Sequence, residues 1–196
     1  MTDRRSLRKT LRAARAGLSP SERRQASTRI AALVSKMLWF KPGTRVGLYA
    51  ALSEEIDTAP LIALAMRRGV TIFLPRIESR RDHRMTFAPP GPRLRYNHYG
   101  IPEPDTTLHV PAHTLQFVFL PLVGFDSRGN RLGMGAGYYD RALSFRRLRH
   151  HWWGPRLIGI AHSCQHVDAI EPIPSDIPLD TVVTERGIQV FRGENR

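Results

Sequence analysis

The stretch FVFLPLVGFDSRGNRLGMGAGYYDR, residues 117–141, decides the fold. Its apolar start, 117–123, is typical of a central strand buried on both faces of a parallel sheet, although Pro121 weakens the last positions. A glycine-bearing loop follows over 124–137, and a helix is expected from Tyr138 to about Leu148. A strand, a loop and a helix in this order indicate an α/β fold.

The flanking sequence repeats this alternation of strands and helices. Ser19, Pro20 and Glu22 form a capping box, which predicts the start of a helix. Thr58 is expected to cap another helix, which Gly69 ends. The expected helices span 4–16, about 20–37 and 58–68, and the expected strands span 45–49, 70–74, 157–161, 181–184 and 188–191. Residues 75–111 are expected to be irregular, with at most a short strand at 85–87.

These elements predict one three-layer, Rossmann-like α/β domain over residues 1–196. Its sheet is mainly parallel, helices cover both faces, and the basic N-terminal helix folds back onto the glycine loop. The composition is 41% hydrophobic and 24% charged, which is typical of a globular chain. No apolar run is long enough to span a membrane, and no signal region follows the N-terminus, so we expect a cytoplasmic protein without a membrane partner.

The net charge of +13 is concentrated at the N-terminus, where residues 1–50 hold 12 Lys and Arg against two acidic residues. Such a field could attract nucleic acid, but it could equally attract a small polyanion. The single cysteine, Cys164, excludes an intrachain disulfide framework and a thiolate-cluster metal site. Charge alone therefore leaves both classes of anion open.

The glycine loop carries the clearest chemical signal. Glycines let backbone amides approach an anion, and the following helix start adds partial positive charge. The loop lacks the Gly-Lys-Ser/Thr of a P-loop, and Tyr138 stands where the dinucleotide fingerprint has its last glycine. On spacing alone, a phosphate cradle and a plain glycine turn are about equally good interpretations.

Residues 121–126 and 129–141 together resemble the signature of the 5-formyltetrahydrofolate cyclo-ligase family. The resemblance extends over nearly the whole chain and includes 4–8, 54–58, 99–104, 158–162, Gln165, 176–180 and 183–185. It implies an ATP- and Mg²⁺-dependent closure of 5-formyltetrahydrofolate to 5,10-methenyltetrahydrofolate, with release of ADP and phosphate. In the family's scheme the formyl oxygen attacks the γ-phosphate, and N10 then displaces the phosphate. This chemistry needs positioning and charge neutralisation and no protein nucleophile.

The resemblance also assigns residues to roles. Arg131, Tyr138 and Asp140 are the expected catalytic residues, and Asp140 and Asp180 are expected to hold Mg²⁺. Expected ATP contacts are Arg4, Arg5, Ser6, Leu7, Arg8, Arg131, Leu132, Gly133, Met134, Gly135, Ala136, Gly137, Tyr138 and Tyr139. Expected substrate contacts are Ala50, Glu55, Met134, Gly135, Ala136, Gly137 and Tyr138. Residues 99–104 are expected to wall the folate site.

Several alternatives stay open at this point. Glu54 competes with Glu55 for the pterin, and some family members carry basic side chains at the positions of Met134 and Ala136. The substrate is 5-formyltetrahydrofolate with a single glutamate or a polyglutamate tail, and the family suggests a monomer that binds no nucleic acid. The competing functions are an ATP-dependent ligase or kinase with another substrate, and a nucleic-acid-binding module built on the basic first quarter.

Overall fold

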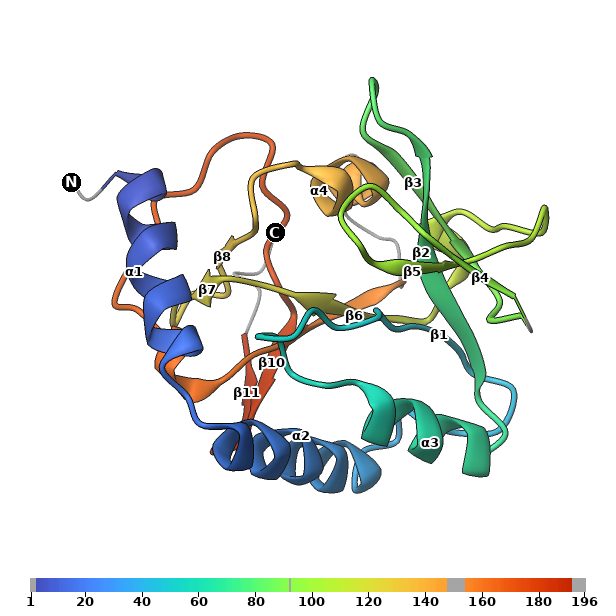
Figure 1. Cartoon of the computed structure of the whole chain (residues 1–196), viewed down its shortest axis with the longest axis horizontal. Helices are drawn as coiled ribbons and strands as arrows, with labels where there is room; N and C mark the ends of the chain where they lie inside the picture. The colour runs from blue at the N-terminus through green and yellow to red at the C-terminus, as the bar shows by residue number, and fades with distance from the viewer. Residues whose placement is uncertain (1–2, 92, 148–153, 192–196) are drawn as a thin grey trace.

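A seven-stranded mixed sheet organises the computed structural model, which describes residues 3–91, 93–147 and 154–191. The strand order is β11-β10-β9-β6-β1-β2-β3 (Figure 1). Neighbours from β10 to β2 are parallel, whereas β11 and β3 are antiparallel at the two edges. The strands are β1 (Arg45–Gly47), β2 (Thr71–Ser79), β3 (Arg84–Ala88), β6 (Phe117–Pro121), β9 (Arg156–Ile160), β10 (Thr181–Thr184) and β11 (Gly187–Val190). The predicted α/β class with a mainly parallel sheet is confirmed.

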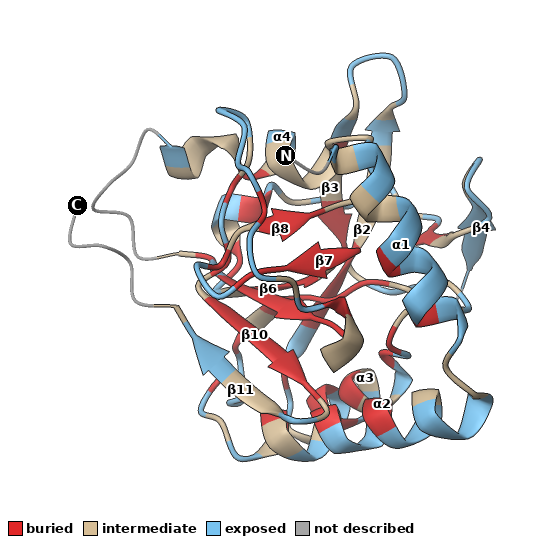
Figure 2. Ribbon diagram, turned by 90° about the vertical axis from the view of Figure 1, so that its left-hand side faces the viewer, coloured by how far each residue is buried: buried red, intermediate tan, exposed pale blue. Residues whose placement is uncertain are grey.

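The central strand β6 is buried on both faces, as its apolar run predicts. Phe119 packs into the core on the side of α2 (Pro20–Ser35) and α3 (Ala59–Arg67), whereas Val118 and Leu120 pack into the core on the other side. This alternation follows the two-residue period of a strand. Figure 2 shows β6 and β10 buried, whereas the edge strand β11 is partly intermediate and partly exposed.

The predicted capping residue makes its hydrogen bond at the start of α2 but not at the start of α3. The Ser19 hydroxyl accepts from the Glu22 amide, and the Glu22 carboxylate accepts from the Ser19 amide, so the predicted capping box is confirmed. Thr58 stands at the start of α3 but makes no capping bond, and its hydroxyl donates to the buried Tyr49 carbonyl. Asp57 accepts from the Ala59 amide in its place.

The expected helix from Tyr138 to Leu148 was too long. Helix α4 covers only Tyr138–Ala142 and continues as a 3-10 turn, η2 (Ser144–Arg147), while Leu148 lies outside the described residues. The side chain of Arg146 binds Asp180, and Arg147 binds the Ser175 carbonyl. These tertiary contacts of η2 compete with a regular helix.

The segment 75–111 is more regular than its prolines suggested. Strand β2 runs through Pro75, which pairs with Phe87 of β3, and a small hairpin forms from β4 (Leu94–Tyr96) and β5 (Pro102–Pro104). The ladder between β1 and β2 ends at Phe73. Pro75 therefore lies where β2 has a partner on one side only, and its missing N–H is tolerated there.

Helix α1 (Arg4–Ala16) folds back beside a second hairpin, which joins β7 (Gly124–Phe125) to β8 (Arg131–Leu132) (Figure 1). Its buried Leu11 packs in a cluster with Val123, Leu132 and Ile170. Any Cβ at Gly124 would collide with the Leu11 side chain, so glycine lets the helix approach the hairpin. No helix in the described part of the chain is long and apolar enough to cross a membrane.

Candidate active site

A cleft of about 740 Å³ lies at the carboxyl ends of the parallel strands. Tyr49 and Ala50 follow β1, and Pro121 and Leu122 end or follow β6, so these residues form its floor. Loops at this edge of an α/β sheet are the usual place for ligands. The cleft has the size of a typical small-molecule site.

Strands β7 and β8 take up part of the loop expected over 124–137, and residues 133–137 remain irregular. From here on, the glycine loop means 133–137, all of which line one wall of the cleft. Gly135 and Gly137 have φ values of +107° and +72°, which side chains other than glycine rarely adopt. The Arg8 side chain of α1 donates from Nε to the Gly133 carbonyl at 2.8 Å. The loop and the basic helix therefore meet directly, as the sequence predicted.

Arg131 and Asp140 form an ion pair across the base of this loop. The Nη2 of Arg131 lies 2.5 Å from Oδ1 of Asp140, and the arginine side chain is only 4% exposed. The same carboxylate oxygen accepts from the Ile177 amide at 3.3 Å. The Nε of Arg131 is buried and has no hydrogen-bond partner among the described residues. A buried guanidinium with donors to spare is suited to binding an anion.

Arg4 binds a second carboxylate on the same side of the cleft. Its guanidinium bonds both oxygens of Asp176, at 2.8 and 3.3 Å, and also the Glu171 carbonyl. Both Arg4 and Asp176 line the cleft, and Asp176 is the neighbour of Ile177, which binds Asp140. Two carboxylates and two arginines thus lie around the end of the glycine loop.

Glu55 also lines the cleft, and its carboxylate lies near the phenols of Tyr49 and Tyr139. Burial raises the pKa of Glu55, while the Leu52 amide and the Arg15 guanidinium partly oppose this shift. Burial and the nearby Glu55 charge also raise the pKa of the Tyr49 and Tyr139 phenols well above the ordinary range. The phenols therefore stay protonated at neutral pH, and that of Tyr49 donates to the Ile56 carbonyl.

The hairpin of β4 and β5 forms the outer wall. Buried Glu103 accepts from the Ile77 amide and from the Asn97 side chain, so it ties the hairpin to β2. Tyr99 stands edge-on to Tyr138, with ring centroids 6.2 Å apart. The expectation that 99–104 wall the cleft agrees with Tyr99, Ile101, Pro102 and Glu103, which line it.

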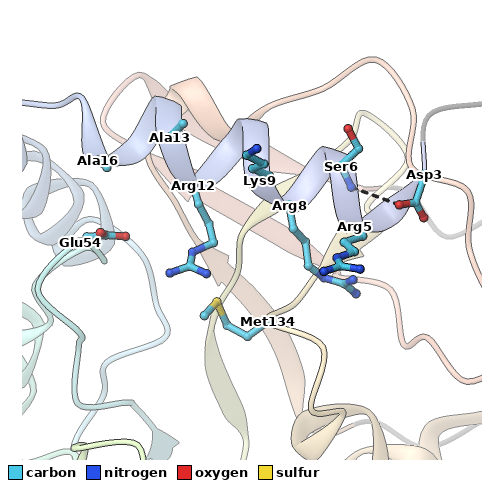
Figure 3. A pocket seen from close by; sticks show the side chains of 10 residues that line it. All are labelled: Asp3, Arg5, Ser6, Arg8, Lys9, Arg12, Ala13, Ala16, Glu54 and Met134. Carbon is cyan, nitrogen blue, oxygen red and sulfur yellow. Dashed lines mark hydrogen bonds between the residues drawn. The ribbon is translucent and has the colours of Figure 1, made fainter.

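A second, more open hollow of about 730 Å³ adjoins the cleft along α1. Figure 3 shows the side chains of Arg5, Arg8 and Arg12 extending from the helix toward Met134. We call this hollow the α1 groove, lined by Asp3, Arg5, Ser6, Arg8, Lys9, Arg12, Ala13, Ala16, Glu54 and Met134. Arg8 and Met134 line both hollows, so the groove opens into the cleft beside them.

The structure brings most of the predicted site residues to the cleft. Those that line it are Arg4, Arg8, Ala50, Glu55, Arg131, Gly133, Met134, Gly135, Ala136, Gly137, Tyr138, Tyr139 and Asp140. Arg5 and Ser6 line the α1 groove, whereas Leu7 and Leu132 pack in the apolar cluster under α1. Glu54 binds the buried Arg15 at 3.3 Å and lines the groove, so Glu55 alone of the two glutamates lies in the cleft.

Asp180 does not join Asp140, contrary to the predicted metal pair. It precedes β10 and therefore lies at the amino end of a parallel strand, away from the loop at the carboxyl ends. Both of its oxygens bind Arg146 at 2.9 Å, and one also accepts from the Leu157 amide. Asp176, four residues earlier, is the acid that reaches the cleft. The matching motif 176–180 contains both acids, and sequence alone could not tell which one faces the loop.

His83 is a further residue of the cleft that the sequence did not single out. It lies in the turn between β2 and β3, far from the glycine loop in sequence, and its ring contacts Ala136 and Tyr138. The stretch around it is polar and carries no motif, so only the folded hairpin brings it to the site.

Comparison with known proteins identifies the family. The sequence model of the 5-formyltetrahydrofolate cyclo-ligase family matches residues 1–185. A Haemophilus influenzae protein named 5-formyltetrahydrofolate cyclo-ligase is 30% identical, with 90% of this chain and 94% of that protein covered. The solved 5,10-methenyltetrahydrofolate synthetase of Aquifex aeolicus has a TM-score of 0.82 at 29% identity, covering 98% and 95% of the two chains. That of Mycoplasma pneumoniae has a TM-score of 0.73 at 25% identity, covering 94% and 99%.

Proposed function

Since the chain belongs to the 5-formyltetrahydrofolate cyclo-ligase family, we propose that its cleft closes 5-formyltetrahydrofolate to 5,10-methenyltetrahydrofolate while ATP becomes ADP and phosphate. The observation that carries the proposal is one continuous cleft lined both by a buried arginine beside a glycine loop and by a half-buried carboxylate. The arginine and the loop suit phosphates, and the carboxylate suits the amino-pyrimidine edge of a pterin.

At the glycine loop, the chain's own groups position and neutralise the triphosphate. Arg131 lines the cleft beside the loop, and its buried Nε has no partner among the described residues, while Arg8 and Arg4 reach the same region from α1. The formyl oxygen attacks the γ-phosphorus and ADP departs. N10 then attacks the formyl carbon, its proton is lost, and phosphate leaves with the former formyl oxygen. Each step gains from alignment and charge neutralisation, so no nucleophilic side chain is required.

Glu55, which lines the same cleft, is placed to accept two hydrogen bonds from the pterin. Its partly desolvated carboxylate would gain more from such donors than an exposed one would. Ala50 leaves space on the floor of the cleft beside it. Glu54 is assigned a structural role, because its partner is the buried Arg15.

We expect Glu55→Gln to weaken folate use and to stabilise the fold at neutral pH. A carboxyl whose pKa rises on folding loses stability as the pH increases through that raised pKa, so removing its charge should raise the thermal midpoint there. At acidic pH, where the carboxyl is protonated in both states, the gain should vanish. The kcat/KM for 5-formyltetrahydrofolate should fall about tenfold, since this is roughly the effect of losing one charge-assisted hydrogen bond.

Glu54→Gln is the matched control for this substitution. It should lower the thermal midpoint, since it leaves Arg15 without its counterion, and it should leave the folate KM within about twofold. A larger loss of folate affinity in Glu54→Gln than in Glu55→Gln would transfer the pterin role to Glu54.

The chain's acids can also hold the Mg²⁺ that such reactions use. We assign this ion to the side of Asp140 and Asp176, whose carboxylates line the cleft beside the loop, in place of Asp180. Mg²⁺ in nucleotide sites takes one or two carboxylates, with phosphates and water completing its shell, so this donor set fits. When bound, the ion neutralises charge on the triphosphate. The test is product formation, which should require both ATP and Mg²⁺ and stop in excess chelator; an undiminished rate with chelator would refute the metal assignment.

We also propose that the α1 groove receives the polyglutamate tail of the substrate. It opens into the cleft at Arg8 and Met134, and its remaining basic side chains, Arg5, Lys9 and Arg12, face a hollow with only two acids in its wall. Successive γ-linked glutamates place carboxylates along an extended chain, which complements a row of cations on one helix face.

Replacing Lys9 and Arg12 together by glutamine tests this proposal. The KM for a pentaglutamate substrate should rise about fivefold to tenfold, and added salt should shrink the difference, since the contacts are exposed. The KM for the monoglutamate form should stay within about twofold. Arg24→Gln with Arg29→Gln, on the exposed face of α2, is the charge-matched control. Equal changes for both substrates would contradict a tail site.

A further inference from the structure

His83 occupies an unusual backbone position at the end of the β2–β3 turn. Its φ of +51° is the one positive value among the non-glycine residues that the structure describes. This region costs free energy for residues with a side chain, and it persists where surrounding contacts enforce it. Within the turn, the Ser79 hydroxyl bonds the Asp82 carboxylate and accepts from the Asp82 amide. The turn is thus well defined, and His83 is directed at the glycine loop.

The imidazole makes two contacts with that loop. Its Nδ1 bonds the Ala136 carbonyl oxygen at 2.5 Å, and because a carbonyl can only accept, Nδ1 carries the proton. The ring also stacks on Tyr138, with centroids 5.2 Å apart and planes 26° from parallel. A second donor, Nη1 of Arg141, reaches the same carbonyl at 3.1 Å.

Ala136 needs such fixing, because it lies between two glycines in positive-φ conformations. Glycines on both sides leave its peptide groups free to rotate unless other groups hold them. No oxygen in the described ranges accepts from the amides of residues 134–137. A carbonyl held by His83 and Arg141 cannot turn to compete for those amides, so they stay available to a ligand.

We infer that His83 is a positioning residue for the glycine loop: through Nδ1 it holds the Ala136 carbonyl in the orientation that leaves the loop amides free for phosphate oxygens. The inference rests on the proposed assignment of this loop to ATP. It gives the β2–β3 hairpin a role in nucleotide affinity, although β3 is an edge strand of the sheet.

Two substitutions separate the donor from the ring. In His83→Asn, the side-chain amide nitrogen takes the place of Nδ1, and asparagine tolerates a positive φ. In His83→Phe, the ring can still stack on Tyr138, but the donor is lost. If, without the donor, the loop has its binding-competent orientation in only about a tenth of the molecules, the ATP dissociation constant rises about tenfold. For His83→Phe we expect this rise both in the ATP Kd measured without folate and in the ATP KM. Its kcat at saturating ATP should stay within about threefold of the unmodified value. For His83→Asn, the ATP Kd, the ATP KM and kcat should all stay within about threefold of the unmodified values.

His83→Gly guards against a failure to fold. Glycine accepts the positive φ, so this variant should keep the thermal midpoint near that of the unmodified chain and still bind ATP about tenfold more weakly. His109→Phe is the matched control, because His109 is exposed and also bonds a carbonyl, that of Thr107, through Nδ1. It should leave ATP binding unchanged.

An ATP Kd within twofold of the unmodified value in both His83→Phe and His83→Gly would overturn the inference. So would a His83→Asn that binds as weakly as His83→Phe, since the donor would then not be the active feature. If the unmodified chain binds ATP but forms no methenyltetrahydrofolate, the proposed reaction fails while the binding series still decides the role of His83.

Discussion

Arg131→Lys is expected to lower kcat/KM for ATP by between about tenfold and a hundredfold while the fold survives. Lysine keeps the positive charge beside Asp140 but loses the planar fork, which binds Asp140 on one side and still has donors for a phosphate. Losing one hydrogen bond to a charged group costs about 1.5–3 kcal/mol, and each tenfold in rate is about 1.4 kcal/mol.

Arg128→Lys is the control for this substitution. Arg128 lies three residues earlier in the same loop connection, is exposed, and does not line the cleft. Its kinetics should match those of the unmodified chain. Steady-state kinetics at varied ATP, together with thermal unfolding of both variants, measure the effect. Comparable losses in Arg128→Lys and Arg131→Lys would indicate that general positive charge, and not the fork of Arg131, acts on ATP.

Asp140→Asn is expected to lower kcat by more than tenfold in a chain that still folds, although its thermal midpoint should fall because the buried Arg131 loses its counterion. The substitution keeps an oxygen for the Ile177 amide and for Arg131, but it removes the charge that balances Arg131 and that is proposed to help hold Mg²⁺. An acid that only stabilises the first turn of a helix would contribute about 0.3–1 kcal/mol to folding and nothing to turnover. A near-normal kcat at limiting Mg²⁺ would therefore contradict the assignment.

Asp126, which precedes the glycine loop, is not a suitable control for Asp140. It is completely buried and accepts four hydrogen bonds, from the amides of Arg128, Asn130 and Ile170 and from the Asn130 side chain. Asp126→Asn would replace one of the accepting carboxylate oxygens by an NH2 group. That group would face N–H donors, which would destabilise the loop. Asp168→Asn, at an exposed position outside the cleft, removes the same charge without these contacts and should leave kcat unchanged.

The sequence predicted the parts of the fold that local patterns specify. The apolar run before Pro121, the capping box at Ser19 and the terminating Gly69 each act over a few residues, and the structure confirms them. The glycine loop and its neighbour Arg131 could be placed for the same reason. Their meeting with Arg8 follows from the packing of α1 on the β7–β8 hairpin.

Long-range contacts account for what the sequence did not predict. Asp176 and Asp180 lie four residues apart in an irregular segment before β10. Asp176 lines the cleft, whereas Asp180 lies at the amino end of β10 and binds Arg146, and no local pattern distinguishes the two acids. His83 reaches Ala136 across 53 residues through a hairpin that Pro75 made hard to anticipate. Thr58 was expected to cap α3, but its hydroxyl donates to the distant Tyr49 carbonyl, and Asp57 accepts from the Ala59 amide at the helix start.

The central claim is that this cleft couples ATP to closure of the formyl group, and the most direct test is a product balance. The purified chain is mixed with 5-formyltetrahydrofolate, ATP and Mg²⁺, and the absorbance of 5,10-methenyltetrahydrofolate is followed while ADP is assayed in the same samples. The account predicts that methenyltetrahydrofolate and ADP accumulate one for one, and that neither forms when the folate is omitted. ADP release without methenyltetrahydrofolate, or no product under any of these conditions, would contradict it.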